Sequence, residues 1–234
     1  MRLSDIAETL ALPRSSAHGL LQTLVGRGYV ERTEGERYRL AREFLGGTGW
    51  VGGHEALLRH HAMPIMTRAR DACGETLFLG VLSPEDVIHR VCKVLSDEPI
   101  RYDSTGRPAP PLYCSAMGRV LLAHADPERV DAYFARTPLL PVTPYTVTDE
   151  AAIRATLATI RAQGYGTIEQ ENAVGGCGVA APVRNRRGEV IAVLNIATVA
   201  QRYDERRDEM IGAVLTAAAE LSERLGHSKP EVTL

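Results

Sequence analysis

The sequence of 234 residues is poor in cysteine and in aromatic side chains, and it contains no long hydrophobic run. Its four cysteines form no C-x-x-C pair and are too sparse for a disulfide scaffold, so we expect free thiols in a reducing compartment. No apolar stretch approaches the roughly 18 residues that a membrane span needs. Acidic Asp5 and Glu8 lie where a signal peptide would be apolar. The sequence therefore predicts a cytoplasmic protein with no membrane partner.

Strong charge of either sign is also missing. The formal net charge of -2 argues against a protein that is coated with nucleic acid along its whole length. The stretch 13–28 nevertheless holds Arg14, Arg27 and His18 but no acid. With 44% hydrophobic residues the chain can bury a core, and its length indicates a small module joined to a mid-sized one.

Helix and turn signals follow one another closely in the first forty residues. Ser4 is a good N-cap for a short helix, and Pro13 is suited to open a second helix. That second helix carries a complete apolar stripe, formed by Ala17, Leu20, Leu21, Leu24 and Val25. Glycines end it, and two extended segments at 29–32 and 37–40 indicate a hairpin. A helix, a tight turn, a helix and a hairpin predict a winged helix-turn-helix.

The polar side of the second helix suggests contact with DNA, because a helix fits the major groove and short polar side chains reach base edges there. The candidate base-reading residues are Ser15, Ser16, His18 and Gln22. The candidate phosphate contacts are Arg14 on the same helix and Arg32, Arg37 and Arg39 in the hairpin. The alternative is a polar face that packs against a protein partner, and the predicted hairpin favours DNA.

Four runs in this region resemble the winged helix of IclR-type bacterial transcription regulators: LSDIAE at 3–8, LPRSSAH at 12–18, LLQTL at 20–24 and GYVER at 28–32. The resemblance continues almost to the C-terminus. It implies an α+β chain with a DNA-binding domain at 1–45, a linker at 46–58, and an effector-binding domain of GAF-like or profilin-like α/β fold at 59–228. The partners it implies are double-stranded operator DNA, a small-molecule effector that is an organic acid or an aromatic metabolite, and further copies of the chain in a dimer or tetramer. We expect no cofactor and no catalytic activity.

The chain departs from the family pattern near its start. Family members carry a further helix before the position of Ser4, and we expect one apolar face of the winged helix to be uncovered, which indicates a misassigned start or a shortened chain. Gly19 stands where similar proteins often have arginine on the recognition helix, which predicts weaker DNA binding. The family's linker helix falls on a stretch with five glycines between 45 and 53, where Trp50 is the candidate packing residue.

Helical and extended patterns alternate in the second domain. The predicted elements are a helix over 55–73, a β-hairpin over 74–94, a proline-rich loop running into a helix over 105–123, an amphipathic helix over 149–163 that ends at Gly164, and a strand over 189–197.

Similar regulators build the effector pocket from this proline-rich loop and the helix that it enters, an acidic stretch, a loop that ends in a cysteine and the last strand. The candidate effector contacts here are Tyr113, Cys114, Ser115, Met117, Glu169, Cys177 and Asn195. Asn195 has the strongest local argument, because an amide within an apolar strand needs a hydrogen-bond partner when it is buried. That partner is a ligand, the backbone or water, and Ser115 also suits an ordinary N-cap.

The resemblance also indicates where the pocket of this chain differs from the family pattern. Arg119 replaces the family's usual lysine and keeps its charge. The family's pocket cysteine falls on Gly178, and the arginine before it falls on Cys177, so the pocket chemistry should differ.

Some sequence features suggest functions other than regulation by an effector. A redox sensor that uses Cys114 or Cys177 is the alternative, since a thiolate beside helix N–H groups is reactive. No base is recognisably paired with either thiol, so we do not expect catalysis. Three histidines, His54, His60 and His61, lack further ligands at suitable spacing, and no metal site is expected. An interaction module without DNA function is a third hypothesis.

Overall fold

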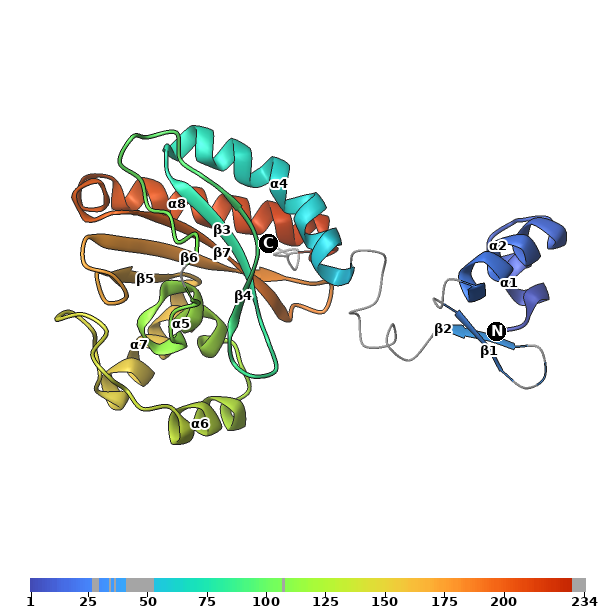
Figure 1. Cartoon of the computed structure of the whole chain (residues 1–234), viewed down its shortest axis with the longest axis horizontal. Coiled ribbons are helices and arrows are strands. Elements are labelled where there is room, and N and C mark those ends of the chain that lie inside the picture. The colour runs from blue at the N-terminus through green and yellow to red at the C-terminus, as the bar shows by residue number, and fades with distance from the viewer. Residues whose placement is uncertain (27–29, 34, 36, 41–52, 107, 229–234) are drawn as a thin grey trace, which may run out of the picture. The chain divides into compact units, whose positions relative to one another are not determined.

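The structure is a computed structural model that describes residues 1–26, 30–33, 35, 37–40, 53–106 and 108–228. The chain divides into two compact units, Met1–Leu58 and Arg59–Leu234 (Figure 1). Most of the predicted linker, residues 46–52 with Trp50, lies outside the described residues. Residues 53–58 begin the helix α4, which spans Gly53–Cys73.

The first unit has the predicted order of two helices and an antiparallel hairpin. These elements are α1 (Leu3–Thr9), α2 (Arg14–Gly26), β1 (Val30–Thr33) and β2 (Arg37–Leu40). The expected N-cap at Ser4 is wrong, because α1 begins at Leu3 and its N-cap is Arg2, two residues earlier. The backbone N–H of Arg2 donates to the Asp5 carboxylate at 3.0 Å, which satisfies a free donor at the helix start.

A small apolar core holds this unit together. Leu21, Val30 and Tyr38 are buried in it, and partly buried residues of both helices pack against them. The predicted stripe on α2 is only partly covered. Leu20 is 48% exposed, because the core forms around Leu21 on the neighbouring side of the helix.

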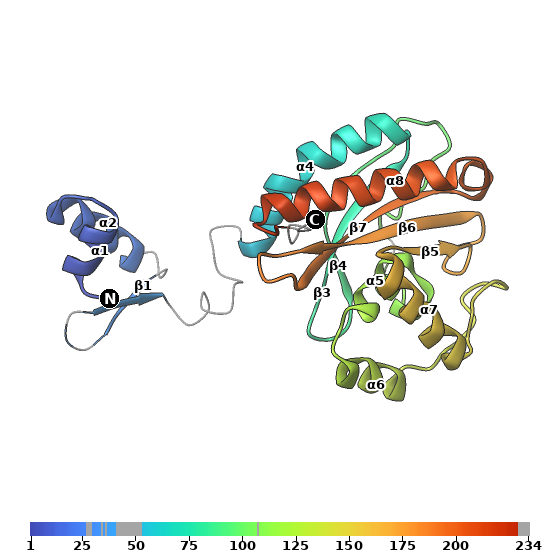
Figure 2. The same cartoon turned by 180° about the vertical axis from the view of Figure 1, so that it is seen from behind.

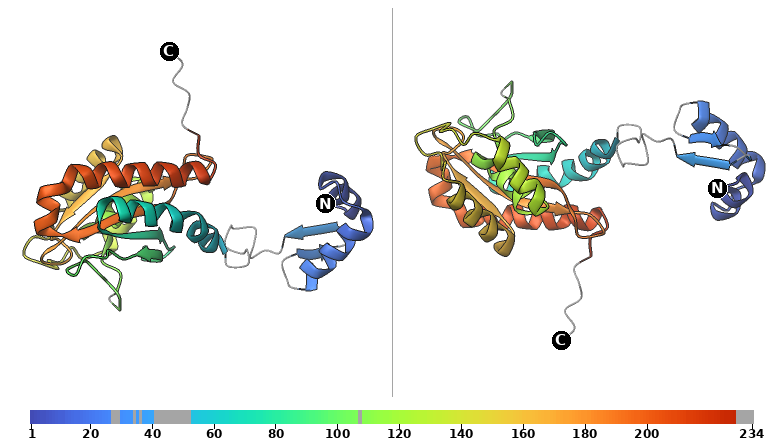
Figure 3. Two further views of the ribbon diagram at one scale, coloured as in Figure 1. Left: turned by 90° about the horizontal axis from the view of Figure 1, so that it is seen from above. Right: turned by 90° about the horizontal axis from the view of Figure 1, so that it is seen from below.

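The second unit is built on one antiparallel sheet of strand order β4-β3-β7-β6-β5. The strands are β3 (Thr76–Leu82), β4 (Ile88–Val94), β5 (Gly166–Glu169), β6 (Gly176–Arg184) and β7 (Val190–Val199). Helices α4 and α8 (Ala200–Arg224) cover one face of the sheet, as Figure 2 and the left view of Figure 3 show. The other face carries α5 (Ala116–Ala123) and α7 (Glu150–Gln163), with α6 (Pro127–Arg136) on the same side.

Local signals explain where the helices of this unit begin and end. The Ser115 hydroxyl accepts the backbone N–H of Gly118 at 3.1 Å and caps α5. The Asp149 carboxylate accepts the backbone N–H of Ala152 at 2.7 Å and caps α7, which ends at Gly164 with a φ of 83°. The predicted α+β combination of a helix-turn-helix unit and an α/β unit is confirmed.

Candidate functional site

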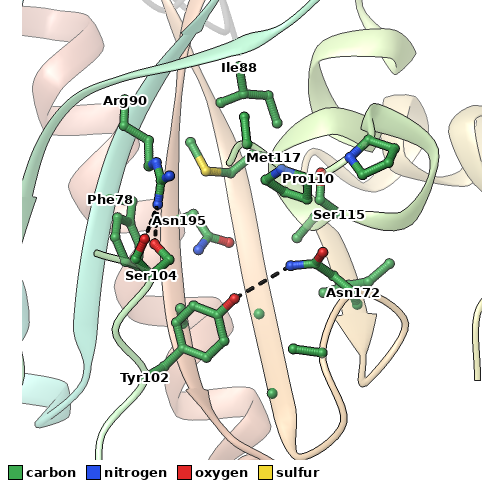
Figure 4. A pocket seen from close by; sticks show the side chains of 18 of the residues that line it. Phe78, Ile88, Arg90, Tyr102, Ser104, Pro110, Ser115, Met117, Asn172 and Asn195 are labelled. Carbon is green, nitrogen blue, oxygen red and sulfur yellow. Dashed lines mark hydrogen bonds between the residues drawn. The ribbon is translucent and has the colours of Figure 1, made fainter. Parts of the chain in front are cut away.

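A cavity of about 360 Å³ lies between the sheet, the start of α5 and the loops beside them (Figure 4). This volume lies within the roughly 300–1,000 Å³ of small-molecule sites. Its apolar lining comes mainly from Phe78 on β3, Ile88 on β4, Met117 on α5 and Ile168 on β5. Pro110, on the loop before α5, adds a rigid wall.

The polar lining of the cavity includes one cationic side chain. The Arg90 guanidinium donates to the Ser104 backbone carbonyl at 3.1 Å and to the Ser104 hydroxyl. On another side of the cavity the Asn172 amide donates to the Tyr102 hydroxyl at 3.4 Å. Both pairs are visible in Figure 4. A ligand would therefore meet a positive charge, amides and hydroxyls around an apolar centre.

Asn195 faces the middle of this cavity from β7 (Figure 4). The residue is only 7% exposed, and no hydrogen bond joins its side-chain amide to any other described residue. Gly178 lies beside it on β6, where an added Cβ would approach the Asn195 Oδ1 to 3.1 Å. The absent side chain of Gly178 thus leaves the amide open to the cavity.

The strand register decides which face each predicted residue occupies. Asn195 pairs with Ala180 and Gly178 pairs with Ala197, so these residues share the cavity face. Cys177 alternates with Gly178, and its side chain lies on the opposite face, which α8 covers. Cys177 therefore lines the cavity through its backbone and not through its thiol.

Only part of the predicted effector set comes together in the cavity. Ser115, Met117 and Asn195 line it with side chains, whereas Tyr113, Cys114 and Glu169 do not line it. The Tyr113 hydroxyl donates to the Leu140 carbonyl at 2.6 Å, Cys114 is fully buried, and Glu169 is exposed at the end of β5. Phe78, Arg90, Tyr102, Ser104 and Asn172 were not predicted as contacts and do line the cavity.

The two thiols of the redox alternative are in an environment that suppresses reactivity. Burial raises the pKa of Cys114 to about 11, and the nearby Glu171 carboxylate acts in the same direction. Burial likewise raises the pKa of Cys177 to about 11. Reactive cysteines have lowered pKa values and partial exposure, so the structure does not support a redox sensor at either position.

The predicted DNA-reading residues lie on an accessible side of the first unit. Arg14, Ser15, Ser16, His18 and Gln22 are all exposed on α2. Ser15 and Gln22 lie on one row of the helix with Gly19 between them, opposite the buried Ala17 and Leu21.

The three hairpin arginines are exposed but do not share one face. Arg37 pairs with Thr33 and Arg39 with Glu31, which places both arginines on the same face. Arg32 pairs with the buried Tyr38 and lies on the other face. Arg39 also forms an ion pair with Glu31 at 2.7 Å, so a phosphate would compete with that carboxylate for it.

Among the described residues, no group of three or more His, Cys, Asp or Glu side chains is arranged to hold a metal ion. No helix in the described part of the chain has the length and apolar character that crossing a membrane requires.

A helix-turn-helix unit with an exposed polar helix, followed by an α/β unit with a lined cavity, defines a two-domain DNA-binding regulator. Comparison with known families agrees. The IclR helix-turn-helix domain matches residues 1–34, and the bacterial transcriptional regulator IclR C-terminal domain matches residues 54–223. The chain belongs to the IclR family and is a DNA-binding transcriptional regulator.

Curated relatives and solved structures cover nearly the whole chain. The glycerol operon regulatory protein of Streptomyces coelicolor is 32% identical over 96% of this chain and 88% of its own length. The HTH-type transcriptional regulator XynR of Escherichia coli is 30% identical over 88% of this chain and 81% of its own. An IclR homologue from Microbacterium hydrocarbonoxydans, solved in complex with 4-hydroxybenzoate, has a TM-score of 0.67 at 30% identity and covers 96% of this chain and 91% of that one. These relatives are named as transcriptional or operon regulators.

Proposed function

We propose that this regulator binds a small carboxylic acid in the cavity beside Asn195, and that the bound acid changes its affinity for operator DNA. The observation that carries the proposal is the Asn195 amide, which is nearly buried and has no partner among the described residues. The Asn195 amide is not among the fully buried polar atoms that lack a partner, so it reaches the cavity space. A ligand there can supply the hydrogen bond that the amide lacks.

The charge in the cavity supports an acid as the ligand. Arg90 brings the guanidinium, whose planar set of donors matches a carboxylate. Phe78, Met117 and Ile168 provide an apolar body that suits an aromatic or short aliphatic skeleton. The solved relative with 4-hydroxybenzoate contains a ligand of this class.

A thermal-shift screen tests the ligand. We expect some members of a panel of small carboxylic acids, including 4-hydroxybenzoate, to raise the melting temperature, whereas the matching neutral amides do not. A ligand at 100 times its Kd adds about 2.7 kcal/mol to the stability of the unit that it binds. Arg90→Met should abolish the shift.

Lys93→Met is the matched control for that variant. Lys93 lies on the same strand, but it pairs with Asp103 at 2.9 Å and does not line the cavity. Shifts by acids and amides of equal size, or equal loss in both variants, would argue against the proposed carboxylate site.

The link to DNA is tested separately. We expect an acid that raises the melting temperature to change the binding of the regulator to its own promoter DNA, measured by fluorescence anisotropy. A ligand shifts this equilibrium only through different affinities for the DNA-binding and non-binding states. Unchanged operator affinity at saturating acid would contradict the proposed link to DNA, and only the proposed binding of the acid would remain.

Self-association is part of the proposal. Recognition helices of helix-turn-helix dimers enter half-sites about one helical turn apart, so we expect a dimer or tetramer in solution. Light scattering behind size-exclusion chromatography measures this directly. A monomer at micromolar concentration would contradict it.

A further inference from the structure

A buried ion pair lies beside the cavity, and effector binding as proposed above does not use it. Arg119 on α5 contacts Glu171, which follows β5, through two hydrogen bonds: Nη1 to Oε1 at 2.8 Å and Nη2 to Oε2 at 2.6 Å. Their side chains are 5% and 10% exposed. A buried pair is weak evidence for stability, because removing two charges from water offsets much of their attraction. Its place in the fold therefore calls for another explanation.

The pair joins three segments that are distant in sequence. We call 108–115, 139–148 and 170–176 the wall segments. Arg119 Nε donates to the Tyr113 carbonyl at 2.7 Å, which holds the first segment. The backbone N–H of Val147 donates to Glu171 Oε2 at 2.9 Å, which holds the second, and Glu171 itself belongs to the third.

Additional hydrogen bonds connect the second and third wall segments. The Thr146 hydroxyl donates to the Glu171 carbonyl at 2.7 Å, and the Thr143 hydroxyl donates to the Gln170 carbonyl at 2.9 Å. The two segments are thus held through backbone atoms as well as through the Glu171 carboxylate.

The wall segments supply much of the cavity lining that does not come from the sheet or from α5. Their lining residues are Pro108, Ala109, Pro110, Pro111 and Ser115 in the first, Val142 in the second, and Asn172, Ala173 and Gly176 in the third. The three segments meet at this ion pair, which adds to the hydrogen bonds of Tyr113, Thr143 and Thr146 that also link them.

We infer that Arg119 and Glu171 are positioning residues that make the three wall segments open and close as one unit. A bound effector would then order the whole wall together. The functional meaning of this inference rests on the proposed function, because the wall matters to regulation only if a ligand binds inside it.

Native-state hydrogen exchange of the full chain, with no ligand added, tests the inference. In the unmodified protein, amides in the three wall segments should open with one common free energy and one common urea dependence. Separate values for the three segments would overturn the inference without any substitution.

Two variants address the pair itself. Glu171→Gln keeps the size of the side chain and removes its charge, and we expect exchange in all three wall segments to quicken about tenfold or more. Arg119→Lys keeps the charge but loses the planar fork of donors, so the same pattern should appear with a smaller amplitude. This milder variant carries the test if Glu171→Gln does not fold.

The control is Arg154→Lys, which alters a half-buried arginine on α7 that lies over the Phe134 ring and pairs with Asp131 and Glu150, away from the wall segments. It should leave exchange in the wall segments unchanged. Faster exchange of β7 to the same extent as the wall would show that Arg119 and Glu171 contribute only to overall stability, and it would overturn the inference. So would a change in one wall segment alone. Failure of every acid in the thermal-shift screen would instead contradict the proposed function and leave this result standing.

Discussion

Gly19 offers a test of how α2 contacts DNA. It lies in the middle of the exposed polar side of α2, between Ser15 and Gln22, and an added Cβ would meet no atom within 4 Å. Alanine therefore fits without strain and should stabilise the helix by about 0.5–1 kcal/mol, because glycine has greater freedom in the unfolded chain. Gly19→Arg should stabilise the helix in the same way and should also add a contact with a DNA phosphate.

Gly19→Ala separates the stabilisation of the helix from the added phosphate contact, because alanine provides only the first. Binding to a mixed-sequence duplex is measured by fluorescence anisotropy over a range of salt concentrations. One added phosphate contact should steepen the slope of log K against log salt by about 0.9 in Gly19→Arg. The alanine variant should keep the slope of the parent chain. Equal slopes in the two variants would refute the placement of this side of α2 against DNA.

Three further predictions follow from buried polar groups. Asn195→Leu should abolish every acid-induced melting shift and leave the unfolding free energy unchanged or about 1 kcal/mol higher, and a loss of stability in urea titration would contradict this. Cys114 and Cys177 should resist iodoacetamide at neutral pH, because burial raises both pKa values to about 11, and rapid stoichiometric alkylation seen by mass spectrometry would contradict it. Burial lowers the pKa of His124 from 6.5, so the unfolded chain binds more protons and stability should fall as pH drops below 6.5. His124→Leu should flatten that part of the urea-midpoint profile, and an unaltered profile would show that other groups cause the loss.

Local chemistry made several features predictable from sequence. Asp149 and Gly164 bound α7 as expected, since a capping carboxylate and a glycine with positive φ act within one turn of chain. The hairpin of β3 and β4 follows from composition in the same way. Asn195 could be singled out because an amide in an apolar strand is conspicuous without knowledge of its neighbours.

Other features depend on register or on distant contacts. A bulge beside Leu79 and Gly80 lets Cys92 pair with Leu79 and Arg90 with Gly80, so simple alternation along β4 does not place Arg90. The face of the sheet on which the Cys177 side chain lies can be assigned only when the pairing of β6 with β7 is known.

The contact of Arg119 with Glu171 spans 52 positions and has no local signal. Helix α8 was not predicted, although its buried Tyr203, Met210 and Val214 are spaced along one helix face.

The alternation along β6 gives this strand two neighbours at once. Gly178 borders the ligand space beneath α5, and the side chain of the adjacent Cys177 lies on the face that α8 covers. Gly178 and Cys177 are consecutive residues, so a ligand that moved β6 at the cavity would also move a side chain on the face that α8 covers. Helix α8 therefore packs against the strand that lines the cavity on its other face, and the ligand binding that we propose would act on α8 through β6.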